Sequence, residues 1–128
     1  MRTTFGWTCR TGITEFNERS IRNWPVQATG ADILRITCIL ATRRDIHVLA
    51  PVHDAVLIEA PIAQIEAEVT RMQEIMRRAS RIVLGQHELR TDFTIVRYPE
   101  SYSDKRGAKI WAEVLQLLHQ IQTAEEAA

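Results

Sequence analysis

The chain has 128 residues, and its 16 lysines and arginines balance 16 acidic residues, so the formal net charge is zero. Apolar residues make up 45% and charged residues 25%, a composition that excludes wholesale disorder. No apolar run approaches the roughly 20 residues that a membrane span needs. The length fits one domain with a real core, which we expect over residues 1–122, followed by a disordered tail at 123–128.

The charges are unevenly distributed along the chain. Residues 1–44 hold seven arginines and three acidic residues, a net charge of +4, whereas residues 45–128 hold nine basic and thirteen acidic residues, a net charge of −4. Zero net charge therefore does not exclude a nucleic-acid partner for the first third. The N-terminus, MRTTFGWTCR, has no signal-peptide core, which predicts a cytoplasmic protein.

The first half of the chain predicts a strand and then a helix. Thr3, Phe5, Trp7 and Cys9 recur at every second position, which is typical of a strand, here ending near Gly12. Residues 13–22 are polar and predict a connection or a short helical turn. Pro25 is well suited to begin a helix, which we expect to run to about Arg44.

The middle of the chain predicts a β-hairpin followed by a second helix. Two short apolar runs, 46–50 and 56–60, flank Pro51-Val52-His53-Asp54-Ala55, which places His53 and Asp54 at or beside the turn. Pro61 closes the second strand and opens a helix whose apolar positions are spaced three and four apart. Gly85 ends that helix.

The last third predicts another strand and a final helix. Residues 89–96 alternate between apolar and polar faces, and residues 108–121 carry apolar side chains at helical spacing. The predicted order is β-α-β-β-α-β-α. We therefore expect an α+β fold in which helices cover a small antiparallel sheet.

Arg19, Asn23 and Gln27 recur at a spacing of four residues. On a continuous helix all three would project from one face, although Pro25 interrupts the pattern. One interpretation is a solvated helix start with Asn23 as its cap. The other is a row of hydrogen-bond donors for the minor groove of nucleic acid, where every base pair offers acceptors.

His53 and Asp54 also allow two interpretations. An aspartate at a hairpin turn commonly serves the turn alone, because its side chain hydrogen-bonds the local backbone. Alternatively, Asp54 is a hard oxygen ligand for Mg²⁺, with His53 as a donor to a nearby phosphate. A single carboxylate cannot hold two metal ions, so the second interpretation requires a partner acid.

Three segments together resemble the C-terminal palm region of family A DNA polymerases, the bacterial DNA polymerase I family, in its plasmid- and phage-like branch. In ERSIRNWPVQATGADILR (18–35), Arg19, Asn23, Pro25, Gln27, Ala31 and Asp32 match a conserved stretch of the family. APVHDAVLIEAP (50–61) resembles motif C, a β-turn-β element centred on His-Asp. ELRTDFTIVRYPESYSDKRGAKIW (88–111) is similar to the end of the polymerase.

The resemblance implies template-directed nucleotidyl transfer by a DNA-directed DNA polymerase, in replication or repair, at a two-ion Mg²⁺ site. Asp54 would bind the catalytic Mg²⁺, and His53 would contact the primer end. Arg19, Asn23 and Gln27 would touch primer and template in the minor groove. The implied partners are primer–template DNA and a deoxynucleotide, and the implied location is the cytoplasm, on the nucleoid.

The chain also departs from the family pattern. Ala55 stands where many relatives carry glutamate, and Gly30 is displaced from its usual position. Motif A, with the second metal aspartate, and motif B, with the nucleotide-binding residues, have no match. We therefore expect the chain alone to be inactive, with self-association or pairing with an upstream polymerase fragment. The alternative is a non-catalytic DNA-binding remnant or split-gene subunit.

Overall fold

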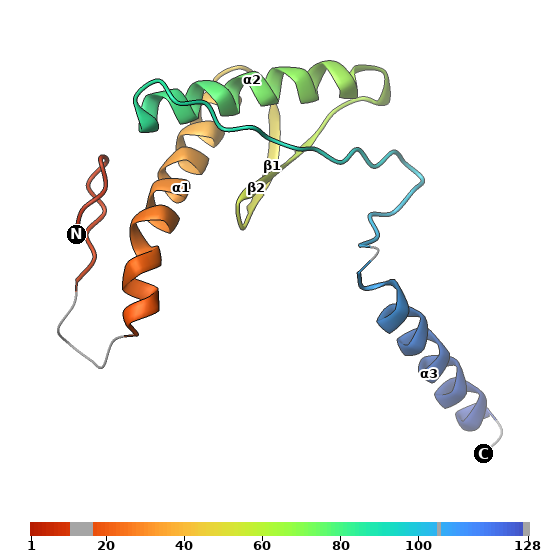
Figure 1. The fold of residues 1–128 in the computed structure, drawn as a ribbon. Helices are drawn as coiled ribbons and strands as arrows, with labels where there is room; N and C mark the ends of the chain where they lie inside the picture. Colours follow the sequence, from red (N-terminus) through yellow and green to blue (C-terminus); the bar gives the residue numbers. More distant parts are fainter. Residues whose placement is uncertain (11–16, 105, 127–128) are drawn as a thin grey trace. The chain divides into compact units, whose positions relative to one another are not determined.

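A computed structural model describes residues 1–10, 17–104 and 106–126 (Figure 1). The chain divides into two compact units, Met1–Phe93 and Thr94–Ala128, each of which is described by itself. The described residues form three α-helices and a two-stranded antiparallel sheet, which confirms the predicted α+β class. Among them, no helix is both long enough and apolar enough to cross a membrane.

Helix α1 (Glu18–Thr42) begins earlier than the sequence predicts. Asn17 caps it, because the Asn17 side chain accepts a hydrogen bond from the backbone N–H of Arg19 at 2.9 Å. Pro25 lies inside the helix, where the Thr29 hydroxyl donates to the Pro25 carbonyl at 2.6 Å. The prediction that Pro25 starts the helix was wrong, since the capping residue, Asn17, lies eight residues earlier in the chain.

The β-hairpin is confirmed. Strands β1 (His47–Val52) and β2 (Ala55–Glu59) pair antiparallel, with a bulge between Val48 and Ala50. The bulge sets Leu49 outside the pairing and bends β1. The inner face of the hairpin carries apolar side chains that pack on the core.

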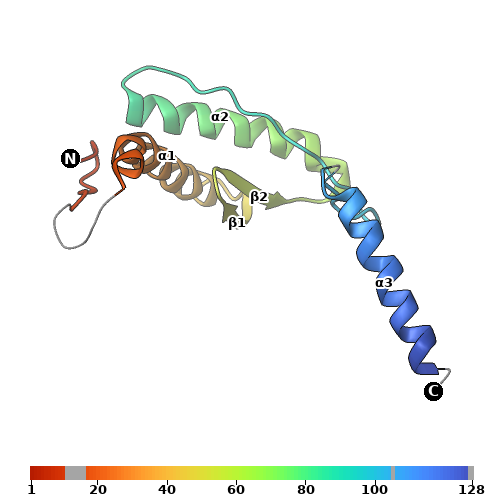
Figure 2. The same cartoon turned by 60° about the horizontal axis from the view of Figure 1, so that its bottom comes forward.

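Helix α2 (Ile65–Leu84) follows a short 3₁₀ turn, Ile62–Gln64. Gly85 ends α2 in the left-handed conformation at φ 61°, which glycine adopts without a Cβ penalty, so the predicted end of the helix is confirmed. Pro61 precedes the 3₁₀ turn, so the predicted start of the α-helix at Pro61 was four residues too early. Helix α1 packs against α2 and against the hairpin (Figure 2). The core lies where these elements meet, and it is built on Ala41, Ile46, Met72 and Ile75, with Leu40, Val48, Val56, Ile58 and Met76 packed against it.

Two predicted strands are absent from the described residues. Residues 89–96 form no strand, and two of them, Leu89 and Thr91, bond through their backbone to side chains of α2 instead. The Leu89 N–H donates to the Ser80 hydroxyl at 3.1 Å, and the Gln73 amide donates to the Thr91 carbonyl at 2.9 Å.

The predicted N-terminal strand was also wrong as far as residue 10. Residues 1–10 form a tight turn closed by a single bridge between Arg2 and Thr8. Gly6 turns the chain at φ 96°, and the Thr3 N–H donates to the Trp7 carbonyl at 2.9 Å. The predicted end of that strand near Gly12, and the connection at 13–16, lie outside the described residues.

Helix α3 (Ala108–Glu126) belongs to the second unit and continues beyond its predicted end at Ile121. The Gly107 N–H donates to the Asp104 carbonyl at 2.9 Å just before the helix starts. The Asp104 carboxylate accepts from Arg106 at 2.8 Å, which anchors the entry to the helix. The domain bounds predicted at residue 122 stay a prediction.

Candidate nucleic-acid interface

Arg19, Asn23 and Gln27 share one helix. Because α1 continues through Pro25, the spacing of four residues brings their side chains to one side of the helix. All three residues are exposed. Asn23 is not the helix cap, since Asn17 has that role. Of the two interpretations, the capping one is therefore wrong, while nucleic-acid contact stays a prediction.

The first turns of α1 carry two arginines that differ in their ion pairing. Arg22 pairs with Glu18 at 2.5 Å, four residues earlier on the same helix. The Arg19 side chain has no ion-pair partner among the residues that the structure describes. Its guanidinium therefore keeps five donors for an outside acceptor.

His53 and Asp54 form the two-residue connection between β1 and β2. His53 adopts a positive φ of 54°, a conformation in which histidine is enriched relative to most residues. Both side chains are exposed at the tip of the hairpin. The structure thus confirms the predicted position at the turn, and the short loop projects both side chains beyond the sheet.

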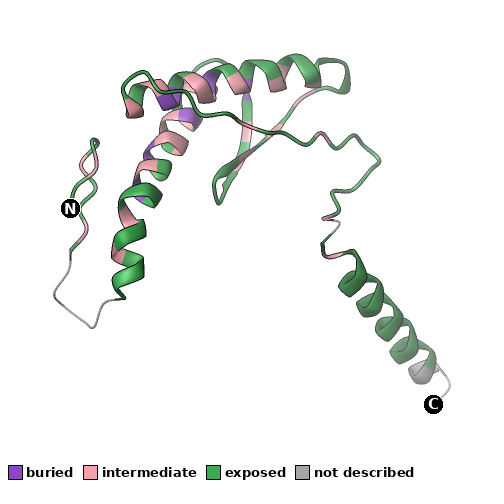
Figure 3. Cartoon of the chain, in the orientation of Figure 1, coloured by how far each residue is buried: buried purple, intermediate pink, exposed green. Residues whose placement is uncertain are grey.

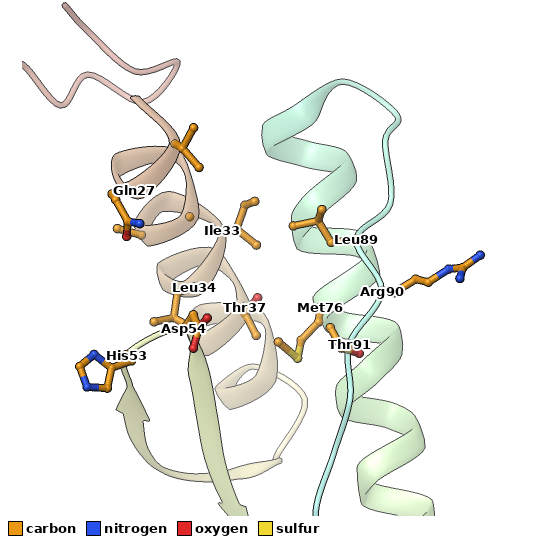
Figure 4. Close-up of a pocket in the computed structure, with 13 residues that line it drawn as sticks. Gln27, Ile33, Leu34, Thr37, His53, Asp54, Met76, Leu89, Arg90 and Thr91 are labelled. Atoms are coloured by element: carbon orange, nitrogen blue, oxygen red, sulfur yellow. The ribbon is translucent and has the colours of Figure 1, made fainter. Parts of the chain in front are cut away.

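A cleft of about 840 Å³ brings part of the predicted site together (Figure 4). Gln27 lines it from α1, and His53 and Asp54 line it from the hairpin tip. Leu89, Arg90 and Thr91 form the wall contributed by the segment after α2. Arg19 and Asn23 do not line the cleft, because they lie about two turns and one turn earlier on α1, respectively.

Sequence reasoning missed the floor of the cleft. Most of it comes from one side of α1, and the contributing residues are Val26, Gly30, Ala31, Ile33, Leu34 and Thr37. Together with Gln27, they recur three and four apart, a spacing that could have revealed a continuous helix face. Thr37 is fully buried, and its hydroxyl has no hydrogen-bond partner among the described residues.

Asp32 is a second buried polar residue that sequence reasoning left without a structural role. It is fully buried, and one carboxylate oxygen accepts from Arg35 at 3.0 Å. The other oxygen has no hydrogen-bond partner in the part of the chain that the structure describes. A half-satisfied buried carboxylate is costly, and nothing in the described residues explains why it is tolerated.

The shifted pKa values lie away from the cleft. Burial raises the pKa of the Cys38 thiol, which is free and partly buried on α1. On the solvated side of α2, the hydrogen bond from Arg77 holds the pKa of the Glu74 carboxyl below its usual value. Both groups belong to the scaffold of the fold.

The acids near the cleft do not complete a Mg²⁺ site. Asp54 is the one acidic residue among the described residues that line the cleft. Across the described part of the chain, no three histidine, cysteine or acidic side chains gather where they could hold a metal ion. Asp54 thus supplies one carboxylate from the cleft, and the two-ion Mg²⁺ site, which needs a second acid, stays a prediction.

No protein-family model matches the chain. No solved structure gives a significant match to it either. The resemblance to family A polymerases therefore rests on the residues of the three segments alone.

Proposed function

We propose that this chain is a palm portion of a DNA polymerase that binds primer–template DNA through the minor groove. Arg19, Asn23 and Gln27 contact the duplex, and His53 and Asp54 lie at the primer end. The observation that carries the proposal is the cleft, because it joins Gln27 from one matching segment to His53 and Asp54 from the other. Neither the four-residue spacing on α1 nor the hairpin turn by itself predicts that these residues line one cleft.

The dimensions of α1 support contact along a duplex. Eight residues separate Arg19 from Gln27, and a rise of 1.5 Å per residue spreads the three side chains over about 12 Å. Base pairs stack about 3.4 Å apart, so this span covers three to four steps. Purine N3 and pyrimidine O2 accept hydrogen bonds at every step, so the three donors can bind duplex of any sequence.

A second candidate is a DNA-binding module that performs no chemistry. It is favoured by Asp54 being the single acid that lines the cleft in the described part of the chain. Both candidates predict duplex binding without primer extension by the chain alone, but they differ in the role of Mg²⁺. Duplex binding that Mg²⁺ strengthens in the wild type but not in Asp54→Asn would support the palm candidate, and duplex affinity indifferent to Mg²⁺ would support the module.

Binding to a labelled primer–template, followed by fluorescence anisotropy, tests the proposal. Arg19→Ala should weaken binding about tenfold, because a charge-assisted hydrogen bond is lost, and Gln27→Ala about fivefold. Raising the salt concentration should weaken binding by the wild type, and less steeply for Arg19→Ala, which releases fewer counterions.

Two matched variants are the controls. Arg22→Ala removes the same charge from the same helix, but at a site already paired with Glu18. Gln116→Ala removes the same amide from α3, outside the proposed interface. Both should bind like the wild type. Absence of duplex binding at moderate salt, or equal losses for Arg19→Ala and Arg22→Ala, would contradict the proposal.

A further inference from the structure

One part of the cleft is lined by large apolar side chains. They come from α1, from α2 and from the segment after α2, and they are Val26, Ile33, Leu34, Met76 and Leu89. Every residue that lines the cleft belongs to the first unit, Met1–Phe93, so the cleft lies within one compact body. Helix α1 is mostly exposed at its start and becomes more buried where it meets α2 (Figure 3). A volume of about 840 Å³ is within the range of small-molecule sites in proteins.

Thr37 adds one polar group without a partner to this apolar part of the cleft. A threonine in a helix can bond the carbonyl four residues earlier. Thr29 and Thr42 do so on the same helix, at 2.6 and 2.9 Å. The Thr37 hydroxyl is fully buried and has no partner among the described residues, so it keeps its donor and acceptor positions. Because a buried hydroxyl without a hydrogen bond is costly, we expect a molecule in the cleft to supply the partner.

Gly30 keeps space free along the same side of α1. A Cβ added at Gly30 would meet no other atom within 4 Å. Glycine is one of the least favourable residues inside a helix, and here no close approach of another segment requires it. Because Gly30 lines the cleft, a larger side chain at this position would occupy part of the cleft.

The lining residues indicate the chemistry of the molecule that fits. Met76 lies across from Thr37 (Figure 4), and a thioether makes favourable contacts with aromatic rings. The charged groups of the lining, Asp54 and Arg90, are exposed, and Figure 4 shows Arg90 pointing away from Thr37 and Met76. The apolar part of the cleft therefore offers one hydrogen-bonding group and no buried charge, which favours an uncharged ligand.

We propose that the apolar part of the cleft binds a neutral aromatic molecule that carries one hydroxyl or carbonyl group. The ring packs among the apolar side chains and against Met76, and the polar group forms a hydrogen bond with the Thr37 hydroxyl. The proposal does not rest on DNA binding, because neither Thr37 nor Met76 is among the DNA contacts proposed above.

Equilibrium dialysis of the full chain against 2-naphthol and against naphthalene tests the site. The wild type should bind one 2-naphthol per chain saturably, and naphthalene about tenfold more weakly, because naphthalene lacks the hydroxyl. Gly30→Leu should abolish binding of both probes and still fold, since leucine favours a helix more than glycine does. Ser20→Leu adds the same side chain at an exposed site of α1 outside the cleft and should leave binding unchanged. Absence of saturable binding to the wild type, or binding that survives Gly30→Leu, would overturn the proposal.

Thr37→Val tests the hydrogen bond, because valine keeps the shape of threonine without the hydroxyl. Affinity for 2-naphthol should fall about tenfold, and affinity for naphthalene should not change. The thermal unfolding midpoint should not fall, because no hydrogen bond within the fold is lost. Thr42→Val, at an exposed hydroxyl bonded to the Cys38 carbonyl, is the control and should leave both affinities unchanged. Equal losses for the two probes, or no loss for 2-naphthol, would show that Thr37 does not bind the ligand.

Discussion

The conformation of His53 sets the geometry of the hairpin tip. Its φ of 54° is unfavourable for most side chains, because Cβ approaches the neighbouring carbonyl, and a glycine would relieve this contact. Histidine tolerates this conformation better than most residues, and its imidazole is exposed, where the proposed function places it at the primer end.

His53→Gly is therefore predicted to weaken DNA binding while leaving the stability of the fold nearly unchanged. The free energy of unfolding should stay within about 0.5 kcal/mol of the wild type, because relief at positive φ offsets the extra chain entropy of glycine. Primer–template affinity should fall. His53→Val is the contrast, since a β-branched residue at positive φ should lower the free energy of unfolding by about 1 kcal/mol. Chemical denaturation and anisotropy measure the two effects, and a large loss of stability in His53→Gly would contradict this account.

At the residue scale, the sequence predicts where a residue lies in the fold better than it predicts what its side chain does there. The hairpin turn follows from two apolar runs flanking His53 and Asp54, because turn chemistry is local. The helix cap was misassigned to Asn23, since Asn17 lies beside a polar stretch with no pattern to mark a helix start. The partnerless Thr37 hydroxyl could not be predicted, because burial depends on residues distant in the sequence.

The wall of the cleft depends on two side chains of α2. Ser80 is fully buried; its hydroxyl donates to the Arg77 carbonyl at 2.8 Å and accepts from the Leu89 N–H at 3.1 Å. Gln73 holds the Thr91 carbonyl two residues further on. These contacts fix residues 89–91 along α2.

Ser80→Ala should loosen this segment. The loss of two hydrogen bonds at a buried site should lower the free energy of unfolding by about 2 kcal/mol. Amide hydrogen exchange at Leu89 should accelerate, because its N–H loses its acceptor. Ser20→Ala, at an exposed site on α1, is the control and should change neither quantity. Unchanged exchange at Leu89 in Ser80→Ala would show that the serine does not hold the segment.

At the element scale, periodicity predicts helices and the hairpin but overpredicts strands. α2 and the hairpin follow from local signals, such as Pro61 and Gly85 at helix ends. The alternation of residues 89–96 indicates an extended backbone, but not its partner. Here the partners are the side chains of Gln73 and Ser80 on α2, which no local pattern announces.

At the scale of the whole molecule, the structure shows where the arginines of the first third lie. Three of the seven arginines of the first third lie on α1, and of these the exposed Arg19 has no ion-pair partner among the described residues. Zero net charge thus averages an arginine-rich first third with an acidic remainder. The cleft between α1 and the hairpin could not be predicted from the sequence, because it arises from packing between segments far apart in the chain.

The central claim is that Gln27 and its neighbours bind duplex through minor-groove acceptors. Substituting 3-deazapurines into the primer–template removes the N3 acceptors, whereas 7-deazapurines remove a major-groove acceptor and serve as the control. The wild type should bind the 3-deaza duplex about fivefold more weakly and the 7-deaza duplex normally. Gln27→Ala should lose little further affinity on the 3-deaza duplex, since the same hydrogen bond is already absent. Equal binding to all three duplexes, or weakening only by 7-deazapurines, would contradict the claim.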